Sequence, residues 1–270
     1  MEGLKCRDYE NKGKPILFNT DMVKAILEGH KTKTRRIIKP QPKEQLKCVI
    51  QHEVSGMACW MEENADQSSE DFMFYKSFEV GDILWVRETW GNWTYDNPEN
   101  NAVYYQYKAD YPEGAKTYMF DDEHECDLPK WHPSIHMPRS AARLFLKVTN
   151  VRPERLQGIT IDGIEQEGIP LTFPLVKLID SEHLKRFINL WDGIYSVPTP
   201  VKEHGIITHY ESYPWEDIQE VKEYKGLPWY VWGNPWVWVN EFEKLDLCEH
   251  GISDYCQKSS GCTYCTEDMI

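Results

Sequence analysis

The chain has 270 residues, of which 41% are hydrophobic and 13% aromatic, and this composition allows a substantial core and excludes an intrinsically disordered chain. The 44 acidic residues outnumber the 30 Lys and Arg residues and leave a formal net charge of -14. That balance excludes a protein that coats nucleic acid regardless of sequence, because such proteins neutralise many phosphates. It is compatible with a nucleoside-like ligand at a local basic site.

The sequence shows no apolar run near the roughly 18 residues of a membrane span, and its first residues do not resemble a signal peptide. We therefore expect a cytoplasmic protein that does not bind membranes. In that compartment the eight cysteines are thiols or metal ligands rather than disulfides.

The first predicted element is a short helix before residue 30. Thr20 can cap it, Val23, Ile26 and Leu27 repeat at helical spacing, and Gly29 is placed to end it. A basic run over residues 30–39 follows directly, which makes it a feature of the turn after a helix.

The basic run contains both a possible nucleophile and a possible base. The Thr34 hydroxyl can attack a carbonyl, and Lys31 can accept its proton if the pKa of Lys31 is lowered. The neighbouring cations Lys33, Arg35 and Arg36 act in that direction, because like charges disfavour the protonated amine. An ideal strand would point residues 31 and 34 to opposite faces, so spacing alone does not make them partners.

Five further elements follow from hydrophobic periodicity and capping residues. They are a buried strand over 83–86, an alternating strand over 144–149, a short helix over 160–168, a longer helix over about 181–192 and an aromatic strand over 236–245. Several strands with a few short helices predict an α+β fold or a small barrel with long insertions.

Four blocks of this sequence belong together: the segment 29–36, the segment 81–86, the strand over 144–149 with residues 165–167, and the closing aromatic strand. They resemble the ASCH domain, a family with a PUA-like β-barrel fold related to RNA-binding modules. The longer form seen here, with Trp-Val-Arg-Glu-Thr-Trp and Asn-Pro-Trp-Val-Trp-Val, looks like the ASCH proteins of bacteriophages and prophages. The segments that carry the resemblance are residues 29–36, 81–90, 133–139, 165–167 and 234–239. The resemblance implies one ASCH domain over residues 14–245, with insertions near 40–79, 91–137 and 197–234.

Small family members that hydrolyse N(4)-acetylcytidine use a Lys and a Thr of a Gly-x-Lys-Thr-x-Thr motif and the last Glu of a Glu-Gln-Glu motif. The resemblance places these roles on Lys31, Thr34 and Glu167, and it matches Arg36 to an arginine of the same motif. The helical pattern alone does not choose between Glu165 and Glu167, since both lie near the edge of the apolar stripe.

Further candidates for substrate binding lie outside the basic run. The segment 133–139 is either a stiff connector between prolines or brings His136 or Arg139 near the ligand, and large aromatics can stack on nucleobases. The full set of substrate-binding candidates is Arg36, Trp85, Arg87, His136 and Arg139.

Residues 246–270 form a Cys-rich tail with Cys248, Cys256, Cys262 and Cys265, the last two as Cys-Thr-Tyr-Cys. Four thiols close together predict a structural zinc site without an open position, and the alternative is a tail with incidental thiols. No cofactor is expected for catalysis.

Two functions therefore remain open from the sequence. The first is an amidohydrolase that removes an acyl group from an N4-acylated cytidine-like nucleoside. The second is a non-catalytic PUA-like module that binds RNA or a modified nucleoside. Both take a nucleoside or modified RNA base as partner, in a phage or prophage context, and neither predicts tight non-specific binding of nucleic acid.

Overall fold

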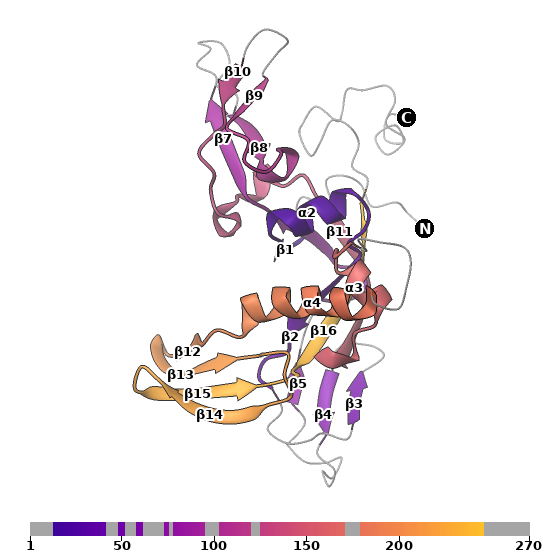
Figure 1. Ribbon diagram of the computed structural model, residues 1–270, viewed down its shortest axis with the longest axis vertical. Coiled ribbons are helices and arrows are strands. Elements are labelled where there is room, and N and C mark those ends of the chain that lie inside the picture. Colours follow the sequence, from indigo (N-terminus) through magenta and orange to yellow (C-terminus); the bar gives the residue numbers. More distant parts are fainter. Residues whose placement is uncertain are drawn as a thin grey trace, which may run out of the picture. The chain divides into compact units, whose positions relative to one another are not determined.

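The computed structural model describes residues 13–41, 48–51, 58–61, 73–75, 78–94, 103–119, 125–170 and 179–245 (Figure 1). These residues divide into two compact units that interleave along the chain. The first unit contains the described residues up to Gly29, those from Gly81 to Lys147 and those from Glu243 on. The second contains those of His30–Val80 and Val148–Phe242.

Three strands form the sheet of the first unit. β6 (Ile83–Arg87) lies between β1 (Lys14–Leu17), which is parallel to it, and the first residues of β11 (Phe145–Arg155), which are antiparallel. The apolar run at Ile83 explains why β6 is central, since four of its five residues are buried. Trp85 lies opposite Phe145 of β11, and both side chains belong to the core of this unit.

Helix α2 (Thr20–Leu27) also belongs to the first unit, and its start differs from the sequence prediction. Asn19, not Thr20, is the N-cap, and its side chain accepts a hydrogen bond from the Met22 amide at 2.8 Å. Val23 and Ile26 are buried as expected, whereas Leu27 is 36% exposed at the edge of the apolar face. Gly29 follows the helix with φ +80°, a conformation that favours glycine.

The rest of the first unit consists of short elements, most of them within the segment 91–137 that was expected to be an insertion. Two hairpins and three single-turn 3-10 helices account for it. They are β7 (Trp90–Thr94), β8 (Val103–Tyr107), β9 (Thr117–Met119), β10 (Glu125–Asp127), η1 (Lys108–Asp110), η2 (Ser134–His136) and η3 (Arg139–Ala141).

The second unit is built on β2 (Lys33–Ile37), β16 (Trp236–Lys244) and the remainder of β11, in the order β11-β16-β2. β2 and β16 are antiparallel. After β11 and the turn η4 (Leu156–Gly158), the helices α3 (Ile161–Gln166) and α4 (Ile179–Tyr195) pack against this sheet (Figure 1). Their apolar side chains form a core with β16, which contains Leu156, Ile164, Ile169, Phe187, Trp191, Val237 and Val239.

Two further sheets complete the second unit. The order of the larger one is β12-β13-β15-β14, from β12 (Thr199–Glu203), β13 (Ile206–Ser212), β14 (Gln219–Tyr224) and β15 (Leu227–Trp232). The smaller one pairs β3 (Cys48–Gln51), β4 (Ala58–Met61) and β5 (Met73–Tyr75). The segments near 197–234 and 40–79, expected to be insertions, therefore carry strands of their own.

The α+β class predicted from the sequence is confirmed. In the described part of the chain none of the sheets closes on itself, so the PUA-like barrel stays a prediction, as does the single domain over 14–245. The predicted tail over 246–270 lies outside the described residues. Among the helices that the structure describes, none has the length and apolarity to cross a membrane.

Candidate functional site

The basic run leads into β2, and strand alternation sorts its side chains onto two faces. Register sets Arg35 opposite Val239 and Thr34 opposite Asn240. Directly opposed residues share a face of the sheet. Val239 packs into the core with α3 and α4, so Arg35 points to the helical face. Thr34 therefore points to the other face, together with Asn240.

Lys31, just before β2, is buried, with only 2% of its surface exposed. Its Nζ donates to the Lys33 carbonyl at 2.8 Å, to the Glu167 carbonyl at 2.7 Å and to Glu167 Oε2 at 2.9 Å. An ammonium has three N–H donors, and these acceptors match all three. A charged amine can be held in this interior because a carboxylate and two carbonyls replace its water.

Glu167 is placed by the end of helix α3. Thr160 caps the start of that helix by accepting from the Gly163 amide at 3.1 Å. Glu167 is the C-cap, and Gly168 follows it with φ +91°, which ends the helix in the usual glycine conformation. Two caps thus fix the length of a six-residue helix and deliver the Glu167 carboxylate to β2.

Glu167 bridges two buried cations. Its Oε2 accepts from Lys31, and its Oε1 accepts from Arg35 Nη1 at 3.0 Å. Arg35 is 4% exposed and Glu167 is 6% exposed, so both ion pairs lie in a region of low dielectric, where an unpaired charge would be costly. Of the two carboxylates that the sequence left open, Glu167 is the one that contacts Lys31.

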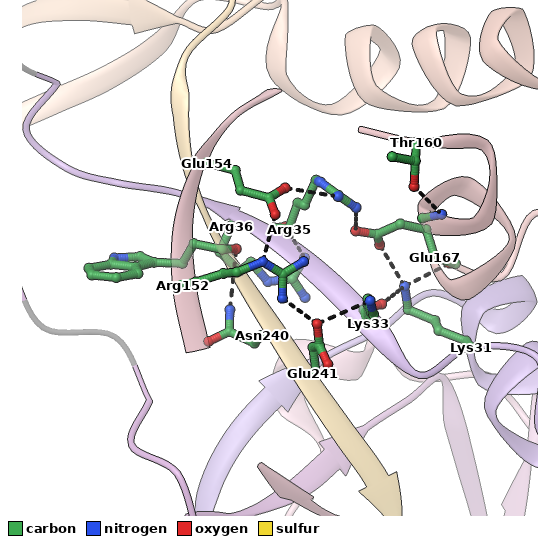
Figure 2. Close-up of polar contacts among 12 residues, drawn as sticks. Lys31, Lys33, Arg35, Arg36, Arg152, Glu154, Thr160, Glu167, Asn240 and Glu241 are labelled. Carbon is green, nitrogen blue, oxygen red and sulfur yellow. Dashed lines mark hydrogen bonds and ion pairs between the residues drawn. The ribbon is translucent and has the colours of Figure 1, made fainter. Parts of the chain in front are cut away.

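The ion pairs continue from this buried pair to the edge of the sheet (Figure 2). Arg35 Nη2 lies 3.3 Å from Glu154 Oε2, and Glu154 Oε1 lies 2.6 Å from Arg152 Nε. Arg152 also pairs with Glu241, whose Oε1 lies 3.0 Å from Lys33 Nζ. We call this alternating series the ion network; its members are Lys31, Glu167, Arg35, Glu154, Arg152, Glu241 and Lys33.

The ion network changes the interpretation of the basic run. The sequence predicts a local basic site, yet Lys31, Lys33 and Arg35 each pair with a carboxylate from α3, β11 or β16. The charge of the run is therefore largely compensated within the second unit, which leaves less of it to attract phosphates.

Burial is the largest cause that lowers the pKa of Lys31 below its ordinary value. The charge and hydrogen bond of Glu167 oppose this shift, and the nearby charges of Arg36 and Arg35 add to it. The sequence predicted a lowered pKa from neighbouring cations alone, so the direction agrees while the main cause is desolvation.

The pKa of Glu241 shifts in the opposite direction to that of a buried acid without a partner. Its partial burial raises the pKa, but the hydrogen bonds from Arg152 and Lys33 outweigh it, and the pKa of Glu241 lies below its ordinary value. The outer end of the ion network is thus ionised at neutral pH.

The structure brings the Lys31 amine and the Glu167 carboxylate into contact, but the Thr34 side chain lies on the face of β2 away from that carboxylate. Thr34 is 1% exposed and shares the opposite face of β2 with Asn240, which is fully buried. Arg36 follows on the same face, opposite Trp238, and its Nη1 lies 3.5 Å from the Arg35 carbonyl.

The other four substrate-binding candidates all lie in the first unit. Trp85 and Arg87 are two residues apart on β6, so their side chains lie on the same face of the strand. The Arg87 guanidinium lies 5.5 Å from the Trp85 ring centroid. Arg139, at the start of η3, lies 5.6 Å from the same centroid. His136 ends η2 and is exposed. The structure thus gathers Trp85, Arg87 and Arg139.

Sequence reasoning missed four members of the ion network: Arg35 as a partner of Glu167, and Glu154, Arg152 and Glu241. The available signal was the alternation of Arg152 and Glu154 along one strand, which puts both side chains on one face. Their cross-strand partners could not be found without the register of β16.

In the part of the chain that the structure describes, no group of three or more His, Cys, Asp or Glu residues is arranged to hold a metal ion. The predicted zinc ligands Cys248, Cys256, Cys262 and Cys265 lie outside the described residues. The zinc site stays a prediction.

Comparison with known proteins adds no relative to this description: no protein-family model, curated protein or solved structure matches the chain.

Proposed function

We propose that the chain is an amidohydrolase that removes the acyl group from an N4-acylated cytidine-like nucleoside in the cytoplasm of a bacterial host. The observation that supports this function is the buried pair of Lys31 and Glu167. Burial lowers the pKa of Lys31, so more of the amine is unprotonated near neutral pH and available as a general base.

In the proposed reaction the Thr34 oxygen attacks the amide carbon while the Lys31 amine takes the hydroxyl proton. The tetrahedral intermediate collapses, the C–N bond breaks, and Lys31 returns the proton to the leaving cytosine amine. Water then hydrolyses the Thr34 ester and releases the carboxylic acid. Glu167 holds Lys31, and Arg36 stabilises the oxyanion.

Strand alternation adds one requirement to this mechanism. Thr34 faces away from the side of β2 on which Arg35 meets Glu167. Lys31 precedes the strand, so its flexible side chain is not bound by the alternation. Proton transfer needs the Lys31 amine to leave Glu167 and reach Thr34, and substrate binding would have to favour that movement.

A second candidate function is a binding module without chemistry. The observation that favours it is the complete set of three acceptors around Lys31 Nζ. An amine held in this way has no lone pair directed at a substrate, and it serves to fix α3 against β2.

Release of acetate from N(4)-acetylcytidine by the purified protein tests the two functions. We expect Thr34→Val to abolish release, because valine keeps the branched shape and removes only the hydroxyl. Thr32→Val is the matched control in the same run and should remain active. Lys31→Arg should be inactive, since a guanidinium is not a base near neutral pH. The wild-type rate should increase with pH as Lys31 loses its proton.

Equal rates for wild type and Thr34→Val would remove Thr34 as nucleophile. If neither protein releases acetate while both bind the nucleoside, the chain is a binding module.

A further inference from the structure

The carboxylate of Glu167 is shared by two cations of the basic run (Figure 2). Its Oε2 lies 2.9 Å from Lys31 Nζ, and its Oε1 lies 3.0 Å from Arg35 Nη1. All three side chains are buried, so water screens these pairs little. One negative charge therefore compensates two positive charges, and each cation contacts an oxygen that the other does not use.

Departure of the Lys31 amine, which the proposed hydrolysis requires, changes the charge balance of this group. If Lys31 were the only partner of Glu167, its departure or the loss of its proton would leave a buried carboxylate without a counter-charge, and such a state is strongly unfavourable. With Arg35 in place, the carboxylate keeps one cation at 3.0 Å. A guanidinium does not lose its proton in proteins, so this counter-charge persists while Lys31 titrates.

Arg35 is held by groups other than Lys31. It lies within strand β2, whereas Lys31 precedes the strand. Its Nη2 lies 3.3 Å from Glu154 Oε2 on β11. Helix α3 also lies close to the guanidinium, because a Cβ added at Gly163 would be 3.4 Å from Arg35 Nη2. Arg35 can therefore stay beside Glu167 when the Lys31 side chain moves.

Lys31 titrates among charged groups of β2, α3, β11 and β16. They are Glu167, Arg35, Arg36, Lys33, Glu154, Arg152 and Glu241, with the exposed Glu28 and His30 just before Lys31 in the chain. Burial is the largest cause that lowers the pKa of Lys31, while Glu167 raises it and the charges of Arg36 and Arg35 lower it. Removing Arg35 takes away a lowering charge and leaves the whole carboxylate to Lys31, so both effects would raise this pKa.

We propose that Arg35 is a positioning residue of the hydrolase: it keeps Glu167 paired when the Lys31 amine leaves, and it thereby releases Lys31 to act as the base for Thr34. This role rests on the proposed function and acts through Glu167. The proton still passes from the Thr34 hydroxyl to the Lys31 amine, and Arg35 neither gives nor takes one.

The rate of acetate release from N(4)-acetylcytidine, measured against pH with the full chain and corrected for uncatalysed hydrolysis, tests this role. We expect the wild-type rate to rise with pH to a plateau. In Arg35→Gln the rise should lie about one pH unit or more higher, with a rate about tenfold lower below it and a recovered plateau. Arg186→Gln, whose arginine pairs with Glu182 on α4, is the matched control and should follow wild type. An unshifted rise in Arg35→Gln, with or without a uniform loss of rate, would overturn the proposal.

Titration of the Lys31 amine itself, followed by NMR of lysines isotopically labelled at Cε, separates this proposal from the hydrolase. Lys31→Arg identifies the resonance by its absence. The pKa of Lys31 should be higher in Arg35→Gln than in wild type. It should be lower in Glu154→Gln, because this replacement removes a negative charge and leaves Arg35 to Glu167 alone.

An equal pKa of Lys31 in wild type and Arg35→Gln would overturn the role of Arg35 even if acetate is released. The expected shifts without acetate release by wild type would instead overturn the hydrolase and support Arg35 as the counter-charge of Glu167. Circular dichroism shows whether each variant is folded. If Arg35→Gln does not fold, Glu154→Gln decides: a lowered pKa of Lys31 supports the proposal, and an unchanged or raised one overturns it.

Discussion

Replacing Glu167 by glutamine tests whether the ion network is held by its buried carboxylate. Glutamine keeps the shape of the side chain but removes the charge that Lys31 and Arg35 share at 2.9 and 3.0 Å. The side chains of these two cations are 0% and 3% exposed, so water cannot replace the lost carboxylate. Removing one partner of a buried ion pair typically costs about 3–5 kcal/mol, and we expect Glu167→Gln to lie in that range.

The assay is urea unfolding followed by circular dichroism, with Glu165→Gln as the matched control. Glu165 lies two residues earlier and is only half-buried, so its replacement should change the free energy of unfolding by about 0.5 kcal/mol or less. Equal unfolding midpoints for the two variants would refute the reasoning, because the buried pairs would then contribute no net stability.

The pH dependence of the same experiment has a defined sign. The folded pKa of Lys31 lies below its ordinary value of 10.5, so between these values the unfolded chain binds more protons and stability rises with pH. Glu167 raises the pKa of Lys31, and the variant therefore releases this proton at lower pH. The difference in free energy of unfolding between wild type and Glu167→Gln should narrow as the pH rises from the folded-state pKa of Lys31 in the variant to that in wild type. A difference that stays constant up to pH 10.5 would contradict the lowered pKa.

Two further predictions concern the first unit and the tail. Burial raises the pKa of Glu88 although Arg143 opposes the shift, so the folded state binds this proton more tightly, and the stability that the proton confers is lost as pH rises from 4.5 through the folded pKa. Relative to Glu88→Gln, wild type should therefore lose stability over that range in urea unfolding, and parallel pH profiles would contradict it. Elemental analysis should find about one zinc per purified chain and none after truncation behind Leu245, whereas equal, near-zero zinc in both would exclude the predicted site.

Much of the secondary structure could be predicted because its signals are local. The helical repeat before Gly29, the apolar run at Ile83 and the caps at Thr160 and Gly168 each lie within a few residues of the element that they define. Periodicity and capping act over one or two turns, so they predict an element without knowledge of its neighbours. The strands β12 to β15 were missed, because most of their residues are exposed or half-buried and their sequences do not alternate strictly between polar and apolar residues.

The candidate site divides in the same way. The sequence by itself determined that residues 30–39 concentrate positive charge after a helix, and that Trp85 belongs to a buried strand. Only the tertiary structure decided that Glu167, 136 positions from Lys31, is its partner, and that the cations of the run meet Glu154 and Glu241. It also decided that Arg139 joins Arg87 on Trp85. The physical reason is that ion pairs depend on strand register and helix packing, which set distances between residues far apart in the chain and leave no local pattern.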